Sequence, residues 1–472
     1  MATTEQILAR HVARLGIDEL PAEAVTATRR GLLDTFACML AGLRSAECAS
    51  LANIFERRGG IGESTAFGVS APLPAGSSAF LNGALAHWCE WDDLHDLGII
   101  HASAAIWPAL LSVAEARGLT DAPAMDEVLA TAAASYDVAG RISEVLTPLS
   151  PNGWYSTSVA SAAAAAAGLA RLSGMDEDGI LSVMGLAATA SSLLRQPILD
   201  RVSGKNALCA QTARVAMDAL DLASAGVKGA TSFLEGEYAL GRMLAGVTPD
   251  FSAALSDLGG RFSVTEISLK PYPCCRATHP SIDLALTLRD RVDVSAIERI
   301  DVSVCQPMYE VVGRPFAPGE NPRMAALFSI PYTVASAFLR GGVDLGIFEP
   351  SAIRQDSRMR DLAERVVVSP YPIPAGTTMY QVPVTMTCVG NAGPLAELST
   401  IAVSGSPEKP LTAAEFEKKL LACGENALDG ADMDALLKQN ATGLSDGLGP
   451  LLALARKARF WQPKTALPAA AQ

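Results

Sequence analysis

The first half of the chain carries apolar residues at the spacing of α-helices. Between residues 4 and 240 they recur three and four positions apart, and turn signals such as residues 18–21 and 173–176 separate the runs. The clearest runs are Ile7, Leu8, Val12 and Leu15; Leu32, Leu33, Phe36 and Leu40; and Ala124, Val128, Leu129 and Ala132. This pattern predicts an all-helical domain over residues 1–263.

The periodicity changes after about residue 264. Short β-rich runs bounded by Pro, Gly and Ser occur at residues 297–304, 365–369, 380–388 and 396–403. Residues 281–289 and 331–339 have helical spacing instead, the second with Pro331 in its first turn. We therefore expect a smaller α+β domain over residues 264–405.

The C-terminal part returns to helical spacing at residues 412–437. We expect residues 406–472 to rejoin the helical domain, with a frayed end at residues 463–472. The predicted fold class is thus mainly α, with a large all-helical domain and a smaller α+β domain.

Length and charge narrow the classes of function. A chain of 472 residues is too long for one ordinary core. The formal net charge of -13 argues against nucleic-acid binding, because phosphate contacts need a basic surface. An acidic substrate would then need a local cationic pocket.

Hydropathy and cysteine usage predict a soluble cytoplasmic protein. Mean hydropathy is +0.24, but the alanine-rich stretch at residues 159–172 contains Arg171 and is shorter than the roughly 20 residues of a membrane span. Small side chains instead let buried helices approach closely. The nine cysteines are scattered, and the first residues lack the features of a signal peptide. We expect reduced thiols and no membrane contact.

Ionisable residues are crowded between residues 87 and 101. In a chain that is 49% hydrophobic and 18% charged, this stretch holds His87, Glu90, Asp92, Asp93, His95, Asp96 and His101. A helix over residues 82–94 would place His87, Glu90 and Leu94 on one face. Three interpretations compete: an acid/base site, a metal site and a solvated helix end. We favour acid/base chemistry and expect no metal, because the spacing matches no zinc signature.

Two further segments carry cations. Lys205 follows Gly204 at the start of an expected helix over residues 207–222, where an ammonium and free backbone N–H groups suit a carboxylate. Residues 270–279 contain Lys270, Arg276 and His279, which can neutralise a di- or tricarboxylate or protonate a leaving group. Solvated surface remains the alternative for both segments.

Three other residues in these regions have more than one interpretation. Cys274 and Cys275 are adjacent and lack Cys-x-x-Cys spacing, so we expect buried bystanders. Tyr332 lies just inside an expected helix, where tyrosine is typically a packing residue and can also reach a substrate oxygen.

Taken in this order, the segments resemble the MmgE/PrpD family, which includes 2-methylcitrate dehydratases and cis-aconitate decarboxylases. The resemblance covers nearly the whole chain and rests on residues 82–93, 101–103, 204–205, 270–279 and 328–332, with a weaker match at 31–35. It implies a lyase or isomerase without cofactor or metal, whose helical domain and smaller lid domain enclose the site. It also implies a homodimer. Members dehydrate 2-methylcitrate, decarboxylate cis-aconitate or epimerise iminodisuccinate.

The resemblance also assigns roles to residues. His101, Lys205, Lys270 and His279 match the family's acid/base and carboxylate-binding positions. Asp92 and Asp93 match its paired aspartates, which orient His101 or cap the helix. Three positions depart from the pattern: Glu90 replaces the common aspartate, Tyr155 replaces a histidine within residues 153–158, and Leu94 replaces a small hydroxyl residue. Tyrosine is a poor base at neutral pH, and leucine makes the pocket more apolar. A substrate with fewer polar groups or a bulkier alkyl group would suit these changes.

The leading hypothesis is a cofactor-free lyase that dehydrates or decarboxylates a small polycarboxylate. The expected catalytic residues are His101, Glu90, Lys205, Lys270 and Tyr155, and the expected substrate-binding residues are Asp93, Arg276, His279 and Tyr332. An epimerase or isomerase of a small dicarboxylate is the alternative, and a non-catalytic binding protein is the third.

Overall fold

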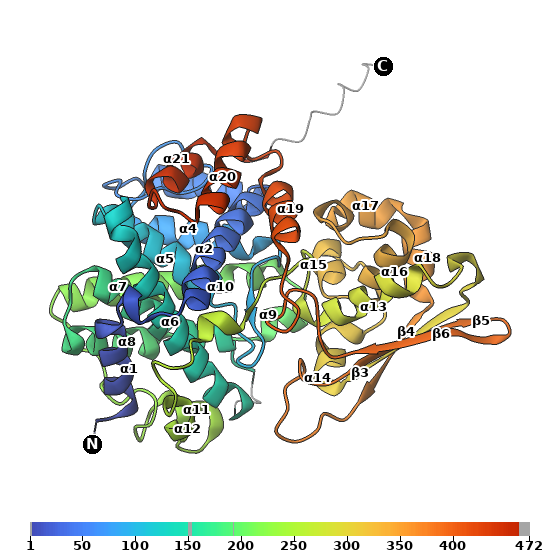
Figure 1. Cartoon of the computed structure of the whole chain (residues 1–472), viewed down its shortest axis with the longest axis horizontal. Helices are drawn as coiled ribbons and strands as arrows, with labels where there is room; N and C mark the ends of the chain where they lie inside the picture. Colours follow the sequence, from blue (N-terminus) through green and yellow to red (C-terminus); the bar gives the residue numbers. More distant parts are fainter. Residues whose placement is uncertain (1, 150–152, 192, 462–472) are drawn as a thin grey trace.

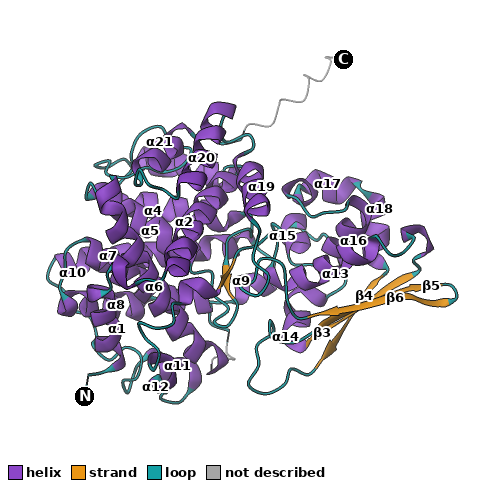
Figure 2. Ribbon diagram, viewed as in Figure 1, coloured by secondary structure: helices purple, strands orange, loops and turns teal. Residues whose placement is uncertain are grey.

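The computed structural model describes residues 2–149, 153–191 and 193–461. Helices dominate, and the strands are confined to a small sheet and one short pair (Figure 2). The prediction of a mainly α fold is confirmed. Figure 1 shows a larger helical lobe beside a smaller lobe that carries the sheet.

The larger lobe is built by the first half of the chain. Its helices are α1 (Thr4–Arg14), α2 (Ala22–Gly42), α3 (Ala46–Arg58), α4 (Ala75–Trp88), α5 (Ser103–Ala116), α6 (Ala122–Leu149), α7 (Ser156–Leu172), α8 (Glu177–Ala190), α9 (Gln196–Leu199), α10 (Leu208–Ser224), α11 (Leu240–Ala245) and α12 (Ser252–Leu255). The buried α4 packs against α2, α5 and α10. A Cβ atom at Gly42 would lie 2.2 Å from the Leu85 carbonyl oxygen, so only glycine permits this approach of α2 to α4.

The alanine-rich stretch lies inside α7. Almost all of its side chains are buried, and α7 packs between α6, α8, α5 and α10. Small side chains allow these close helix contacts. In the described part of the chain, no helix combines the length and the apolar composition that crossing a membrane would require.

The smaller lobe contains a four-stranded mixed sheet. Its elements are α13 (His279–Arg289), β3 (Arg299–Cys305), α14 (Gln306–Met308), α15 (Pro322–Leu327), α16 (Ile330–Arg340), α17 (Pro350–Gln355), α18 (Ser357–Glu364), β4 (Val366–Tyr371), β5 (Val384–Gly390) and β6 (Gly393–Thr400). The strand order is β4-β3-β5-β6, with β3 and β4 parallel and the other pairs antiparallel. Burial alternates along β5 because one face packs on helices such as α13.

Most predicted elements of this lobe are found, with shifted ends. The expected run at residues 380–388 becomes a strand only at Val384, directly after Pro383. Proline has no N–H to donate to a ladder, so pairing begins behind it. The expected helices at residues 281–289 and 331–339 correspond to α13 and α16.

The chain returns to the larger lobe at its C-terminal end. The helices there are α19 (Ala413–Gly424), α20 (Gly430–Thr442) and α21 (Gly449–Lys457). Buried residues such as Phe416, Leu436 and Leu451 belong to the core of the larger lobe, whereas a second core draws its residues from positions 274–388. We keep domain boundaries at residues 264 and 405 as a proposal. The frayed end predicted at residues 463–472 lies outside the described residues.

One predicted helix is wrong in its extent, and this matters for the site. The helix expected over residues 82–94 ends at Trp88. Glu90 has a φ angle of 53°, which an α-helix does not tolerate, and Leu94 begins the short strand β1 (Leu94–His95), which pairs with β2 (Ile267–Ser268). The acidic residues therefore lie on a loop between α4 and β1.

Candidate active site

The loop of residues 89–93 is held in an unusual conformation by side chains from elsewhere. The left-handed backbone of Glu90 costs about 1–3 kcal/mol for a non-glycine residue. Asn206, in the 3₁₀ turn η2 (Ser203–Ala207), donates to the carbonyls of His87 at 3.2 Å and Trp88 at 3.3 Å. Lys270 Nζ donates to the Glu90 carbonyl at 2.8 Å. These bonds fix where the following carboxylates lie.

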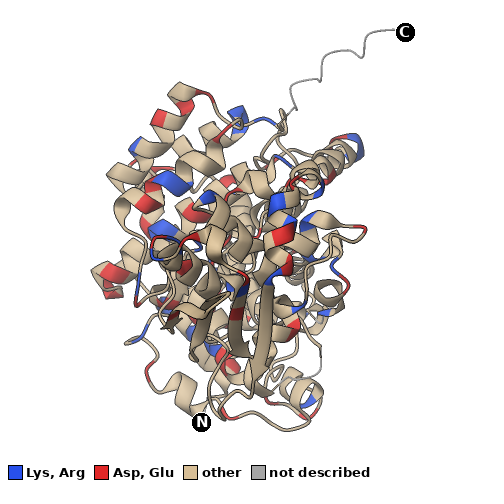
Figure 3. Cartoon of the chain, turned by 90° about the vertical axis from the view of Figure 1, so that its right-hand side faces the viewer, with Lys and Arg blue, Asp and Glu red and all other residues tan. Residues whose placement is uncertain are grey.

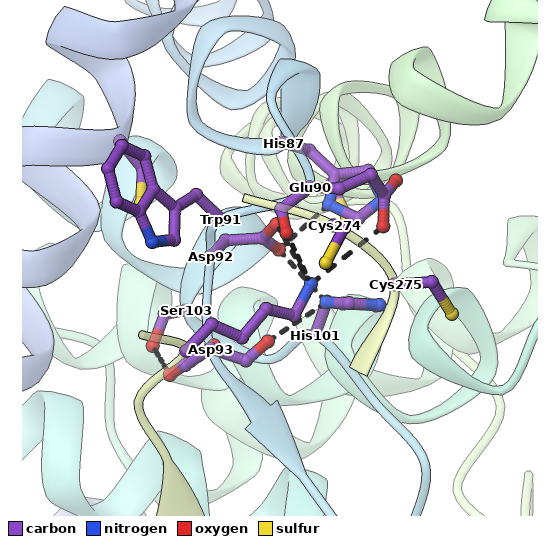
Figure 4. Close-up of polar contacts among 12 residues, drawn as sticks. His87, Glu90, Trp91, Asp92, Asp93, His101, Ser103, Cys274 and Cys275 are labelled. Atoms are coloured by element: carbon purple, nitrogen blue, oxygen red, sulfur yellow. Dashed lines mark hydrogen bonds and ion pairs between the residues drawn. The ribbon is translucent and has the colours of Figure 1, made fainter. Parts of the chain in front are cut away.

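Asp92 is shared between two imidazole rings. Its Oδ2 atom lies 2.7 Å from His87 Nδ1 and 3.0 Å from His101 Nδ1. His101 Nδ1 is also 2.9 Å from the Asp93 carbonyl oxygen, as Figure 4 shows. Both partners of His101 Nδ1 are acceptors, so this nitrogen carries the proton. In the neutral ring, Nε2 then has the free lone pair.

His101 is therefore arranged as a base. Burial lowers its pKa, Asp92 opposes this, and the positive charge of Lys270 adds to it, with a result of about 4. The ring is neutral at pH 7 and keeps 12% of its side-chain surface exposed. Its far edge points away from Asp92 and Asp93, toward the side on which Cys275 lies (Figure 4).

His87 links the Asp92 carboxylate to Lys205. Its Nε2 atom lies 2.7 Å from Lys205 Nζ and 3.3 Å from the Tyr155 hydroxyl. Burial disfavours the imidazolium, but the negative charge of Asp92 and of further anionic neighbours such as Glu90 together outweigh burial and raise the pKa of His87 to about 10. A contact of 2.7 Å between two nitrogens needs one donor and one acceptor, so the His87–Lys205 pair shares a proton.

Glu90 brings the two lysines together. Its side chain forms an ion pair with Lys205, and its Oε2 atom lies 3.8 Å from Lys270 Nζ. Burial would raise the pKa of Glu90, but Lys205 and its cationic neighbours lower it to about 2. Lys270 is itself fully buried; burial alone would lower its pKa, but Asp92 and Glu90 raise it. The cluster thus keeps its carboxylates ionised between fixed cations.

A cavity of about 260 Å³ opens between the two lobes at this cluster. Glu90, His101, Lys205 and Tyr155 reach it from the larger lobe, where Leu94 and Ile198 add apolar wall. The smaller lobe contributes Arg276, Cys275, Ala277, Pro307, Glu310, Val311, Phe328, Met379 and Tyr380. Lys205 Nζ lies 5.4 Å from the centre of the Phe328 ring, a cation–π contact across the lobes.

Two family models match the chain over most of its length. The MmgE/PrpD N-terminal domain matches residues 6–252, and the MmgE/PrpD C-terminal domain matches residues 272–442. The chain belongs to the MmgE/PrpD family. The resemblance predicted from the sequence motifs is confirmed.

Two relatives in this family carry names of lyase type. The chain is 27% identical to the cis-aconitate decarboxylase-like protein oryM of Aspergillus oryzae over 378 residues, which cover 74% of this chain and 76% of the relative. It is 23% identical to human cis-aconitate decarboxylase over 390 residues, which cover 79% and 78%. These names describe the relatives.

Five of the predicted site residues meet at the cavity of this MmgE/PrpD member. They are Glu90, His101, Tyr155, Lys205 and Arg276. The Tyr155 hydroxyl stays protonated because burial holds its pKa well above the usual range, so this residue serves as a hydrogen-bond donor. Lys270 does not line the cavity and instead lies behind Glu90, where it fixes the loop.

Three predicted substrate-binding residues lie away from the cavity. The Tyr332 hydroxyl donates to the Ile347 carbonyl at 2.7 Å within the second core. His279 is fully buried, and its Nε2 atom lies 3.3 Å from the Cys274 carbonyl. Asp93 is buried behind the loop, where it accepts from Ser103. None of the three lines the cavity.

Two groups of side chains have the residue types of metal ligands. Ligand atoms of His87, Asp92 and His101 lie within 4.8 Å of one another. The contacts of Asp92 Oδ2 to the Nδ1 atoms of both rings have the lengths of direct hydrogen bonds. The second group is His95, Glu144 and Glu266, in which both carboxylates accept from Arg261. Hydrogen bonds account for both arrangements.

Sequence reasoning assigned no role to three residues of the site, His87, Asn206 and Arg195, and for Asp92 the resemblance implied that it orients His101 or caps the helix. His87 and Asp92 lie in the crowded stretch, but their bridge depends on the loop that replaced the expected helix end. Asn206 directly follows Lys205, and only its polar side chain beside that lysine could have marked it in the sequence. Arg195 lines the cavity, and no motif marks it.

Proposed function

We propose that this protein is a cofactor-free lyase that removes water or carbon dioxide from a small polycarboxylate. One observation carries the proposal: the free Nε2 atom of a neutral His101 and the cationic His87–Lys205 pair serve the same cavity. The decarboxylase names of both relatives support the lyase class.

Dehydration would use both groups. His101 Nε2 takes a proton from the carbon next to a carboxylate, and the C–O bond to the neighbouring hydroxyl breaks as the double bond forms. The leaving hydroxide takes a proton from the His87–Lys205 pair and departs as water. Until that proton is given up, the positive charge of the His87–Lys205 pair stabilises the enediolate charge, because preorganised cations act strongly in a closed site.

Decarboxylation would use the proton donor alone. The C–C bond to one carboxylate breaks, carbon dioxide leaves, and the electron pair stays on the substrate, delocalised toward a remaining carboxylate. A substrate carbon then takes a proton from the His87–Lys205 pair. Tyr155 donates a hydrogen bond in either reaction, and Glu90 and Lys270 position Lys205.

Kinetics of two variants test the proposal. We expect Lys205→Met to reduce turnover at least about a hundredfold in either reaction, the usual scale for loss of an acid or base. His101→Ala has the same effect on dehydration. The panel is citrate, 2-methylcitrate and cis-aconitate, and His11→Gln, which changes the histidine outside the cluster, is the control. Near-normal rates in both variants with intact melting temperatures would contradict the proposal.

An epimerase remains the second candidate, because two proton-transfer groups on one cavity can also serve opposite faces of a carbon. Incubation of a single stereoisomer in deuterated water separates the two. An epimerase returns the acid with deuterium incorporated and no loss of water or carbon dioxide, whereas the lyase releases one of them.

The cellular setting forms part of the same proposal. The nine cysteines are free thiols, and eight of them are buried. Unpaired thiols are typical of a reducing compartment. We therefore keep the cytoplasm as the expected compartment of the enzyme. The homodimer and the absence of a nucleic-acid or membrane partner stay predictions from the sequence.

A further inference from the structure

Three long cations line the cavity, and two of them have anionic partners. Lys205 is paired with Glu90. Arg276 Nη2 lies 3.3 Å from Asp96 Oδ2, and its Nη1 donates to the Ser404 carbonyl at 3.0 Å. Within the described ranges, Arg195 forms no ion pair and no side-chain hydrogen bond. A half-buried guanidinium on a cavity wall without a carboxylate partner is suited to an anionic ligand.

The backbone around Arg195 is fixed to the segment that carries Tyr155. The Arg195 N–H donates to the Gly153 carbonyl at 2.7 Å, and the Tyr155 N–H donates to the Leu193 carbonyl at 2.9 Å. Trp154 and Leu194 form an antiparallel bridge between these two bonds. Arg195 then precedes α9 as its N-cap residue. Its position relative to Tyr155 is therefore set by paired backbone.

The charge of Arg195 acts on the same side of the cavity as that of Arg276. Burial raises the pKa of the Tyr380 hydroxyl well above its usual range, and both guanidinium groups oppose that rise. Tyr380 belongs to the wall contributed by the smaller lobe. Arg195 and Tyr380 thus line the same cavity, one from each lobe.

The remaining wall combines apolar side chains with polar ones such as Thr147, Ser156 and Glu310. Leu94, Ile99, Ile198, Val311, Phe328 and Met379 line it alongside the charged groups. A substrate with carboxylates at every carbon would leave this surface in contact with charge, which costs free energy. A chain with an apolar segment between its carboxylates would instead match a wall that combines cations with apolar side chains.

We propose that Arg195 binds a second, distal carboxylate of the substrate, and that the substrate is a di- or tricarboxylate with an apolar segment beside that group. This inference rests on the proposed function, because it takes the carboxylate at Lys205 as the reacting end. Arg195 is then a specificity-determining residue, which acts on affinity and not on the proton-transfer step.

Calorimetric titration of the full-length protein tests the inference with succinate, glutarate, adipate and the monoamide of each. The wild type should prefer the best-fitting diacid over its monoamide at least about tenfold, the effect of about 1.4 kcal/mol. Arg195→Gln should abolish that preference and leave the affinity for the monoamide unchanged, and Arg195→Lys should restore part of it. Arg299→Gln, which changes an exposed arginine of the smaller lobe, should behave as wild type.

The outcomes separate the anchor from the reaction. A diacid preference that survives in Arg195→Gln, with the variant's melting temperature intact, would overturn the anchor. The same result follows if the wild type shows no diacid preference. If the preference depends on Arg195 but no acid in the kinetic panel is turned over, the anchor stands and the proposed lyase reaction fails.

Discussion

His101 owes its proposed role to its surroundings. Two acceptors fix the proton on Nδ1, and burial lowers the pKa to about 4. We therefore predict that the acid limb of kcat/KM lies well below the usual histidine range, because the free enzyme keeps an unprotonated base down to about pH 4. The check is a pH–rate profile on a panel acid that the protein dehydrates, because only that reaction uses His101 as a base. An acid limb near pH 6.5 would contradict the arrangement.

Asp93 is a buried acid that does not line the cavity. Burial raises its pKa from 3.8 to about 8, and the carboxylates of Asp34 and Asp92 add to this. Between pH 3.8 and about pH 8, the Asp93 carboxyl is ionised in the unfolded chain and protonated in the folded protein. The free energy of unfolding therefore falls as the pH rises through this window.

Asp93→Asn removes that titration. We predict that wild-type stability falls relative to Asp93→Asn between pH 5 and pH 8, by about 1 kcal/mol or more, since one pKa unit corresponds to about 1.4 kcal/mol. Urea denaturation at both pH values measures this difference. Asp178→Asn, at an exposed position, is the control, and equal pH dependence of wild type and Asp93→Asn would refute the prediction.

At this scale the sequence predicted residue types better than roles. His101, Lys205 and Glu90 were found because ionisable groups are rare in so apolar a chain and gather in a few segments. Tyr332 and His279 were placed with the substrate, but neither lines the cavity; the Tyr332 hydroxyl and His279 Nε2 instead contact carbonyl groups of the smaller lobe. The direction of a side chain depends on packing against segments far away in sequence, which no local pattern contains.

Among the elements, the loop after α4 decides the geometry of the site. Glu90 lies within an apparent helical pattern, but its left-handed backbone ends the helical course of the chain. Asn206 and Lys270 donate hydrogen bonds to carbonyl groups of this segment and so compensate for its strain. Lys419 of α19 adds a further contact from the C-terminal helices, donating to the Trp91 carbonyl at 2.8 Å. The prediction of a helix over residues 82–94 missed this loop, because the helical spacing of the sequence continues past Trp88, where the helix ends.

We predict that Asn206→Ala impairs turnover more than stability. Loss of the two carbonyl contacts lets residues 89–92 shift, and a displacement of about 1 Å in a catalytic group can cost up to about a hundredfold in rate. Turnover should fall at least about tenfold while the melting temperature drops by only a few degrees. The exposed Asn53→Ala serves as control, and unchanged turnover in Asn206→Ala would show that the loop holds without these bonds.

At the scale of the whole molecule, an acidic protein contains a cavity that is lined by several cations. On the face that carries the smaller lobe, acidic and basic residues are interspersed (Figure 3), while the cavity gathers cations from both lobes. The fold class and the change from helical to β-rich periodicity could be predicted because both are written in local spacing. Where the lobes meet could not, since it depends on contacts between residues such as Lys205 and Phe328.

A ligand that contacts both lobes should stabilise the folded protein as a whole. At a concentration one hundred times its Kd, it adds about 2.7 kcal/mol to the free energy of unfolding. We predict a rise in melting temperature with a matching polycarboxylate and a smaller rise in Lys205→Met. A thermal-shift series over di- and tricarboxylates measures this, and an equal rise in that variant would place the ligand elsewhere.

Nitrogen-15 NMR of histidine-labelled protein tests the central claim most directly, because the chain has only 5 histidines and His101→Gln assigns the signal. The account predicts that His101 shows a protonated Nδ1 and a free Nε2 at pH 7, keeps this state to about pH 4, and that its Nε2 signal shifts when a bound polycarboxylate is added. A ring that titrates near pH 6.5, or one whose proton resides on Nε2, would contradict the account.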